Sequence, residues 1–287
     1  MKHTSVLVLT LALGSTSAYA GNFVDLRSDL SDLSVANGGL INGANALNAD
    51  KLYIETTSAT YLPGFSETSV SPADGGTGRV IATSINYRTY AGTTTTGTGT
   101  LTLLNWHVTD DVPLLPGEPQ ATIYDFVYRD SADNKLVFAT RYLNEVDNDQ
   151  EANFLYRYGF TGYQTAAAWT FSTDFDLRMY QAGLTASTSS DDIVPFDADA
   201  VRQKGDFSAT EGNPWSGLFF VKTNAPSYTL GDQAIGFFQA GEEGQPQIGG
   251  FISGFVPSAV VPEPGTYALL LAGLGVLGVV TRRRRAW

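Results

Sequence analysis

Residues 121–143 read ATIYDFVYRDSADNKLVFATRYL, two apolar runs on either side of a short polar segment. The runs 121–129 and 135–143 are rich in β-branched and aromatic residues, which favour strands. Residues 131–134 (SADN) have the composition of a tight turn. We therefore predict an antiparallel hairpin here, and this hairpin indicates the class of the whole fold.

Strand patterns continue on both sides of this hairpin. Residues 154–160 (FLYRYGF) place four aromatic side chains on one face of a predicted strand, with Leu155, Arg157 and Gly159 on the other. Residues 171–179 (FSTDFDLRM) alternate apolar and polar side chains without a break, as a half-buried strand does. We predict further strands at 51–61, 79–90, 100–109, 217–222 and 234–239.

These runs predict an all-β body between residues 21 and 260, namely an antiparallel β-sandwich or jelly roll. Helical periodicity is scarce, and only residues 25–35 and 197–204 are predicted as short helices. Residues 91–99 (AGTTTTGTG) are predicted as a loop. A division of the body into two domains near residues 187–199 stays open.

The first 20 residues have the features of a secretory signal peptide. Lys2 supplies a positive start, and residues 6–13 (VLVLTLAL) supply a short apolar core. Ala18 and Ala20 are the small residues that signal peptidase requires before its cleavage site. We expect cleavage before Gly21 and export through the secretion machinery.

Residues 261–287 (VPEPGTYALLLAGLGVLGVVTRRRRAW) form a tail that we expect to lie outside the body. Pro262 and Pro264 cannot continue a sheet ladder or a helix interior. The uncharged run 266–281 would span about 24 Å as a helix, slightly less than a typical hydrocarbon core. A positive run follows and should stay cytoplasmic, which predicts a single C-terminal transmembrane helix with the body on the exported side. The residues of this run are Arg282, Arg283, Arg284 and Arg285.

This tail resembles the PEP-CTERM sorting signal of Gram-negative bacteria, which has a Pro-Glu-Pro motif, a short apolar helix and a terminal Arg cluster in this order. The resemblance implies that an exosortase processes the chain near Pro262, Glu263 and Pro264 after an intermediate tethered to the inner membrane. It also implies a cell-surface or secreted protein, associated with exopolysaccharide and biofilm. A permanent single-pass anchor is the alternative, because an anchor needs apolar length and charge only.

Composition restricts the chemistry of the body. The chain has no cysteine, which excludes disulfides, thiolate metal sites and cysteine nucleophiles. Its net charge is −12 although the tail holds four arginines, so the acidic body repels nucleic acid. Since His3 belongs to the signal peptide, His107 is the sole histidine expected after cleavage. Strand parity groups His107 with Leu103 and Asn105, and we interpret it as a structural or surface residue.

No local pattern indicates a catalytic site. Neither a Gly-x-Ser-x-Gly elbow nor an H-E-x-x-H sequence occurs, and no pair of carboxylates stands out among the acidic residues. We therefore expect a non-enzymatic structural or interaction protein without a cofactor. A secreted glycoside hydrolase is the weaker alternative, since sequence does not show carboxylate separations.

Two kinds of binding site are candidates. Asp147, Asp149 and Glu151 offer hard oxygen ligands for calcium at alternate positions, although without EF-hand spacing. Trp215 lies in a turn-rich segment and is a candidate sugar contact, which would suit a carbohydrate-binding module or contact with extracellular polysaccharide. We predict that Trp106 and Trp169 are core residues, because each shares a strand face with apolar neighbours.

Overall fold

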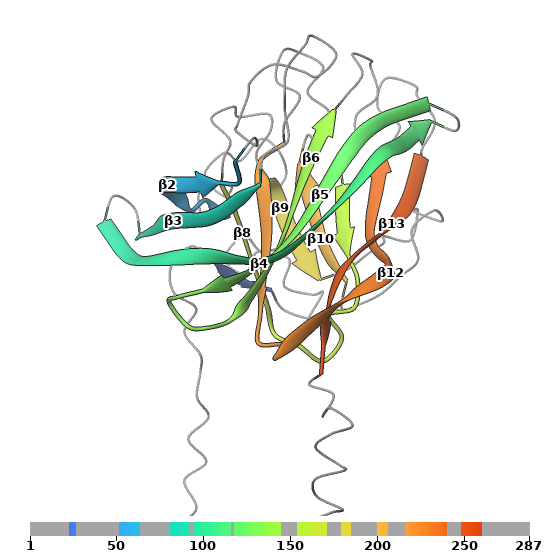
Figure 1. Cartoon of the computed structure of the whole chain (residues 1–287). Helices are drawn as coiled ribbons and strands as arrows, with labels where there is room; N and C mark the ends of the chain where they lie inside the picture. The colour runs from blue at the N-terminus through green and yellow to red at the C-terminus, as the bar shows by residue number, and fades with distance from the viewer. Residues whose placement is uncertain are drawn as a thin grey trace, which may run out of the picture.

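The structure is a computed structural model, and it describes residues 23–26, 52–63, 81–91, 94–115, 118–144, 154–170, 179–184, 200–205, 216–239 and 248–259. Every regular element in these ranges is a β-strand (Figure 1). All strand pairings within the two sheets are antiparallel, which confirms the predicted all-β antiparallel class. The strands are β1 (Val24–Leu26), β2 (Glu55–Tyr61), β3 (Ala82–Ala91), β4 (Thr94–Leu115), β5 (Glu118–Asp130), β6 (Leu136–Asn144), β7 (Phe154–Arg157), β8 (Thr165–Thr170), β9 (Met179–Leu184), β10 (Val201–Gly205), β11 (Leu218–Thr223), β12 (Ser227–Gln239) and β13 (Ile248–Ser258).

The strands form two sheets. One has eight strands in the order β1-β8-β11-β6-β5-β4-β3-β2, and the other has five in the order β13-β12-β7-β10-β9. The predicted hairpin at 121–143 is confirmed, because β5 pairs with β6 and Asn134 donates its backbone N–H to the carbonyl of Asp130 at 2.9 Å. This hairpin occupies the middle of the larger sheet.

The larger sheet curls until its two ends meet. Residues just before β2 contact β8, where Ile54 donates its backbone N–H to the carbonyl of Trp169 at 2.9 Å. The hydroxyls of Thr56 and Thr170 are also 2.7 Å apart. The curl encloses a core cluster that β3, β5, β6, β8 and β11 all supply, including Ile85, Phe126 and Phe220.

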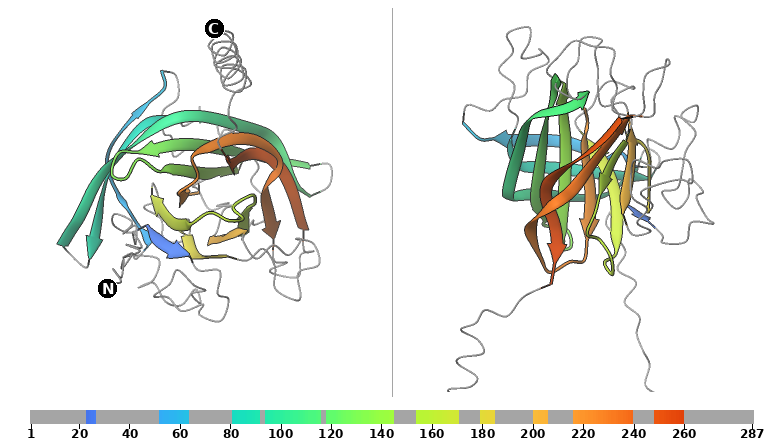
Figure 2. Two further views of the ribbon diagram at one scale, coloured as in Figure 1. Left: turned by 90° about the horizontal axis from the view of Figure 1, so that it is seen from below. Right: turned by 90° about the vertical axis from the view of Figure 1, so that its right-hand side faces the viewer.

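The smaller sheet packs against the opposite face of the larger one. A second core cluster lies between the sheets and joins Val127 and Phe138 of the larger sheet to Leu155, Ile235 and Phe237 of the smaller. The views in Figure 2 show β12 and β13 alongside the arc of β4 and β5. The central strands of the larger sheet are therefore covered on both faces.

Three predicted segments are wrong where the structure describes them. The predicted helix at 25–35 begins within β1, and residues 201–204 of the helix predicted at 197–204 belong to β10. β10 lies between β7 and β9, so its backbone is committed to ladder hydrogen bonds on both sides. The predicted loop at 91–99 is largely the start of β4, which pairs with β3 from Thr94 to Thr102. Most of the predicted strand 171–179 lies outside the described residues.

A single glycine changes the face of an aromatic residue. Phe154, Tyr156 and Tyr158 share one face, as predicted. Phe160 does not join them, because Gly159 has φ +85° and ends the alternation. Phe160 instead packs in the core between the sheets, with its ring 5.4 Å from that of Phe138.

Gly159 and Gly162 form a matched pair for testing this turn. Both have positive φ, but a Cβ at Gly159 would lie 3.1 Å from Val256, whereas a Cβ at Gly162 would meet nothing within 4 Å. We expect Gly162→Ala to destabilise the protein by about 1 kcal/mol through backbone strain alone. Gly159→Ala should lower the free energy of unfolding further, because its Cβ would also press against Val256. Urea denaturation of the purified protein measures both, and equal losses would show that the contact with Val256 relaxes freely.

Candidate functional site

A buried ion pair connects the two sheets. Arg157 of β7 donates from Nη1 to Asp125 Oδ1 of β5 at 2.7 Å, and the two side chains are 0% and 2% exposed. Arg157 Nη1 also donates to Thr140 Oγ1 at 2.5 Å, and Nη2 donates to the carbonyl of Phe255 at 2.7 Å. Asp125 Oδ2 accepts the backbone N–H of Phe255 at 2.5 Å. One pair of charges thus connects β5, β6, β7 and β13.

The environment of Asp125 combines opposing electrostatic effects. Burial is the largest influence and raises the pKa of this carboxyl, while the charge and hydrogen bond of Arg157 and the Phe255 N–H lower it. Gly254 allows β13 to approach the Asp125 carboxylate closely, because a Cβ at this position would lie only 2.7 Å from Asp125 Oδ2. These contacts fix the positions of β5, β6, β7 and β13 relative to one another.

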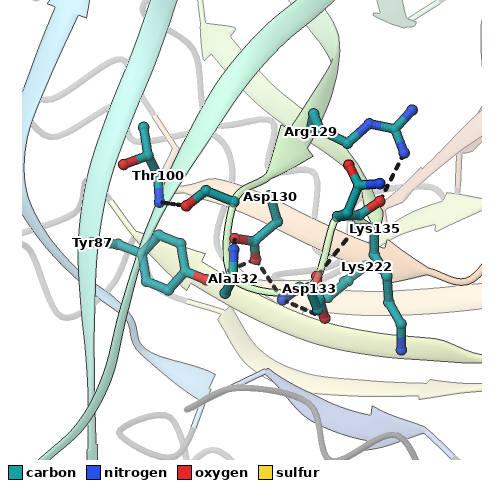
Figure 3. Close-up of polar contacts among 10 residues, drawn as sticks. Tyr87, Thr100, Arg129, Asp130, Ala132, Asp133, Lys135 and Lys222 are labelled. Carbon is teal, nitrogen blue, oxygen red and sulfur yellow. Dashed lines mark hydrogen bonds and ion pairs between the residues drawn. The ribbon is translucent and has the colours of Figure 1, made fainter.

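A second buried charge cluster lies at the turn between β5 and β6 (Figure 3). Lys222 Nζ of β11 is 2.5 Å from Asp130 Oδ2, and both side chains are 0% exposed. Lys222 Nζ also lies 3.3 Å from Asp133 Oδ2, whose side chain is 18% exposed. The register that pairs Lys222 with Val137, and Val137 with Tyr128, puts Lys222 on the face enclosed by the curl.

Aromatic residues close over this cluster. Tyr87 of β3 donates its hydroxyl to Asp130 Oδ2 at 2.7 Å, and the Phe23 ring centroid is 4.1 Å from Lys222 Nζ. Burial and the neighbouring charge of Asp130 raise the pKa of Tyr87, so its hydroxyl stays protonated and donates. Gly99 makes room for this ring, because a Cβ there would lie 2.5 Å from Tyr87 Cζ.

The prediction that Trp106 is a core residue is wrong. Trp106 is 38% exposed and Leu104 beside it 41% exposed, whereas Trp169 is 6% exposed, as predicted for the core. A register shift between Leu103 and Asn105 interrupts the alternation of β4, and the pairing of β3 with β4 ends at Thr102. Beyond Thr102, among the described strands, only β5 pairs with β4. Trp106 therefore loses the cover that β3 gives to the first half of the strand.

The same shift changes the surroundings of His107. Leu103 and Val108 both pack towards the cluster inside the curl, so the predicted grouping of Leu103 with His107 is wrong. His107 pairs in register with Asp125 and is partly buried, and its charge lowers the pKa of Asp125. The structure thus places His107 beside the connection between the sheets.

Comparison with known proteins gives one match. The model of the PEP-CTERM protein-sorting motif matches residues 260–285. The chain carries a PEP-CTERM sorting tail. This motif implies an extracellular protein that an exosortase sorts, in agreement with the resemblance seen in the sequence. No curated protein and no solved structure matches the chain.

The residues of the PEP-CTERM tail and the other sequence-predicted sites lie outside the described residues. Within the described ranges, no group of three or more His, Asp or Glu residues is arranged to hold a metal ion. The same ranges contain no helix long and apolar enough to cross a membrane. The predicted sites that lie outside the described residues are the signal-peptide residues Ala18, Ala20 and Gly21, the calcium candidates Asp147, Asp149 and Glu151, the candidate sugar contact Trp215, the motif residues Pro262, Glu263 and Pro264, and the tail arginines Arg282, Arg283, Arg284 and Arg285.

The buried charges have only a weak signal in the sequence. Asp125 within ATIYDFVYR and Lys222 within LFFVK are charged residues inside strongly apolar runs, and this is the available signal. Burial of such residues requires a partner. The partner itself is not readable from the sequence, because Lys222 and Asp133 are 89 positions apart.

Removing one member of the pair between the sheets should damage the fold more than removing both. Arg157→Met leaves the buried Asp125 carboxylate without its counter-charge, and such losses typically cost about 3–5 kcal/mol. The double variant Asp125→Leu/Arg157→Met has no buried charge to compensate and should recover part of that loss. Denaturant unfolding of the wild type, both single variants and the double variant measures the coupling. If the double variant loses as much unfolding free energy as the two single variants together, then Asp125 and Arg157 act independently.

Proposed function

We propose that the protein is a non-enzymatic component of the cell surface or extracellular matrix, associated with exopolysaccharide and biofilm. The observation that carries the proposal is the PEP-CTERM motif at residues 260–285, which implies sorting by an exosortase. In this scheme the signal peptide directs export and is removed before Gly21. The apolar run 266–281 then holds the chain in the inner membrane as a transmembrane helix until the exosortase acts.

The body has properties that suit an extracellular protein. Its chain lacks cysteine, so stability depends on two large core clusters and on internally paired charges. The whole chain has a net charge of −12 although its tail holds four arginines, so the body is acidic and like-charge repulsion opposes its self-association. These features favour a stable domain displayed among polymers.

Trp106 is the described residue best suited to contact polysaccharide. It is 38% exposed, it has exposed Leu104 and Asn105 beside it, and exposed Thr102 precedes them on β4. An exposed indole ring offers a sugar both an apolar face and an N–H donor. The sequence-based candidate Trp215 stays a second proposed contact.

The two parts of the tail should fail in different ways when changed. Replacing Pro262, Glu263 and Pro264 with alanine leaves the apolar run and the arginines intact, so the chain should still insert in the membrane but should not be processed. Replacing Arg282, Arg283, Arg284 and Arg285 with glutamine removes the charges that oppose translocation, so retention and orientation should fail. Cell fractionation and mass spectrometry of the C-terminus distinguish the two results.

Two controls keep the positive charge of the tail. One is the wild-type chain, and the other is a variant in which lysine replaces all four arginines (Arg282→Lys, Arg283→Lys, Arg284→Lys and Arg285→Lys). The Pro-Glu-Pro variant decides the question of recognition. If it loses its C-terminal segment and reaches the exterior as the wild type does, then the tail is a plain anchor cut by an unrelated protease, and exosortase sorting is wrong.

Trp106→Ala should weaken binding to exopolysaccharide isolated from the producing cells by about tenfold, which corresponds to about 1.4 kcal/mol. Affinity electrophoresis in gels that contain the polysaccharide measures the change. Leu230→Ala is the matched control, because Leu230 is 51% exposed on β12 of the other sheet. Equal retardation of the wild type and the Trp106 variant would remove Trp106 from the proposal.

A further inference from the structure

We propose that Lys222 and Asp130 form an intramolecular amide bond that cross-links β11 to the end of β5. Neither the sorting motif nor the proposed surface role requires this bond. The inference starts from the contact between an amine and a carboxyl group in a fully enclosed site, where Lys222 Nζ and Asp130 Oδ2 are 2.5 Å apart and both side chains are 0% exposed.

Enclosure makes the charged form of this pair costly. Two ions that are removed from water lose their solvation, and their mutual attraction repays this loss only in part. The first step of the reaction is the transfer of one proton from Lys222 Nζ to Asp130 Oδ2, which gives the neutral amine that nucleophilic attack requires. The Phe23 ring, 4.1 Å from Nζ, and the rings of Tyr87 and Phe220 packed around Phe23 keep the surroundings apolar. The amine then stays in contact with the carboxyl group that it attacks, in a site where both side chains are 0% exposed.

The carboxyl group of Asp130 has a hydrogen-bond donor on each oxygen. Oδ1 accepts the backbone N–H of Ala132 at 2.9 Å, and Oδ2 accepts the hydroxyl of Tyr87 at 2.7 Å. Donors fixed in this way stabilise the negative charge that develops on a carboxyl oxygen during nucleophilic attack. Oδ1 is the oxygen that stays in the amide, and Oδ2 is the one that leaves.

Asp133 is placed to carry the proton. Its Oδ2 accepts a hydrogen bond from Lys222 Nζ at 3.3 Å, and its Oδ1 accepts the backbone N–H of Lys135 at 3.2 Å, which fixes its position in the turn. Because the side chain is 18% exposed, Asp133 also marks the side on which the cluster reaches solvent. A carboxylate at this position is a general base for the attacking amine and then a general acid for the leaving oxygen.

The reaction balances without any oxidant or cofactor. Lys222 Nζ attacks Asp130 Cγ and forms the C–N bond, and the Cγ–Oδ2 bond breaks. One proton moves from Nζ through Asp133 to Oδ2, which departs as water. The products are one secondary amide and one water molecule. The chain segment from Asp130 to Lys222 becomes a covalent ring, a constraint that a chain without cysteine cannot obtain from a disulfide.

Mass spectrometry of the native, folded protein tests the proposal directly. The intact mass should be lower than that of the unlinked mature chain by one water molecule. Protease digestion should give one linked peptide that contains both Lys222 and Asp130. A folded protein of full mass would overturn the proposal. A loss of water confined to the Asp130 peptide, as in a cyclic imide, would overturn it as well.

Variants assign the roles of the residues. Lys222→Met and Asp130→Ala should restore the full mass, whereas Lys135→Met, which changes a lysine of the same turn, should keep the linked peptide. Asp130→Asn should still form the bond, with loss of ammonia in place of water. Asp133→Asn should accumulate folded but unlinked protein that circular dichroism cannot distinguish from the wild type. Complete linkage in the Asp133 variant would remove Asp133 from the mechanism, and linkage that persists in the Lys222 variant would overturn the assignment of the amine.

Discussion

The guanidinium group of Arg157 makes hydrogen bonds to Asp125, Thr140 and the carbonyl of Phe255, and these partners belong to three other strands. Apolar packing between two sheets tolerates sliding and rotation, because the hydrophobic effect has no direction. Charge-assisted hydrogen bonds do not tolerate such movement, since each one holds its donor and acceptor within a narrow range of distances and angles. This one side chain therefore sets how the smaller sheet lies on the larger, and it does so from β7, whose register also places β10 and β12.

The curl of the larger sheet depends on a different constraint. β4 pairs with β3 over its first half and with β5 from Leu101 onward, and register shifts between Leu103 and Asn105 and after Thr109 let it bend. The bend carries β3 and β2 over the face of β5, where Ile85 and Tyr87 join the enclosed cluster. The strand that closes the core is therefore also the strand that exposes Trp106 at its other half. The irregular course of β4 thus both closes the core inside the curl and leaves Trp106 exposed.

The sequence predicted those elements whose local pattern agrees with their final environment. The hairpin at 121–143 combines strand-forming runs with a turn, and both features are local. β8 (TAAAWT) was not among the predicted strands, because alanine has low strand propensity, yet all six of its residues are buried and it pairs with β1 and β11. β13 was missed for a similar reason, since it contains Gly249, Gly250 and Gly254. Gly250 and Gly254 leave room for Phe237 and Asp125, which are contacts that only the folded chain defines.

The same limit applies to the chemistry. The PEP-CTERM tail was readable because its three parts are contiguous. The cluster around Lys222 was not readable, because its members come from β3, β5, β11 and the residue before β1, and the fold alone brings them together. The parity argument that grouped Leu103 with His107 also failed, since a one-residue shift in register exchanges the two faces of a strand.

The position of β13 has a mechanical consequence. It is an edge strand, it ends at Ser258, and the sorting motif begins at residue 260. A pulling force applied to the chain through its C-terminal tail therefore enters the body at the end of β13 and meets Phe255 within a few residues. There the backbone N–H and carbonyl of Phe255 are bonded to Asp125 and Arg157, beyond the ordinary ladder with β12. The load thus passes from a peripheral strand directly into the buried contact between the sheets, so the body resists peeling at the point where tension arrives.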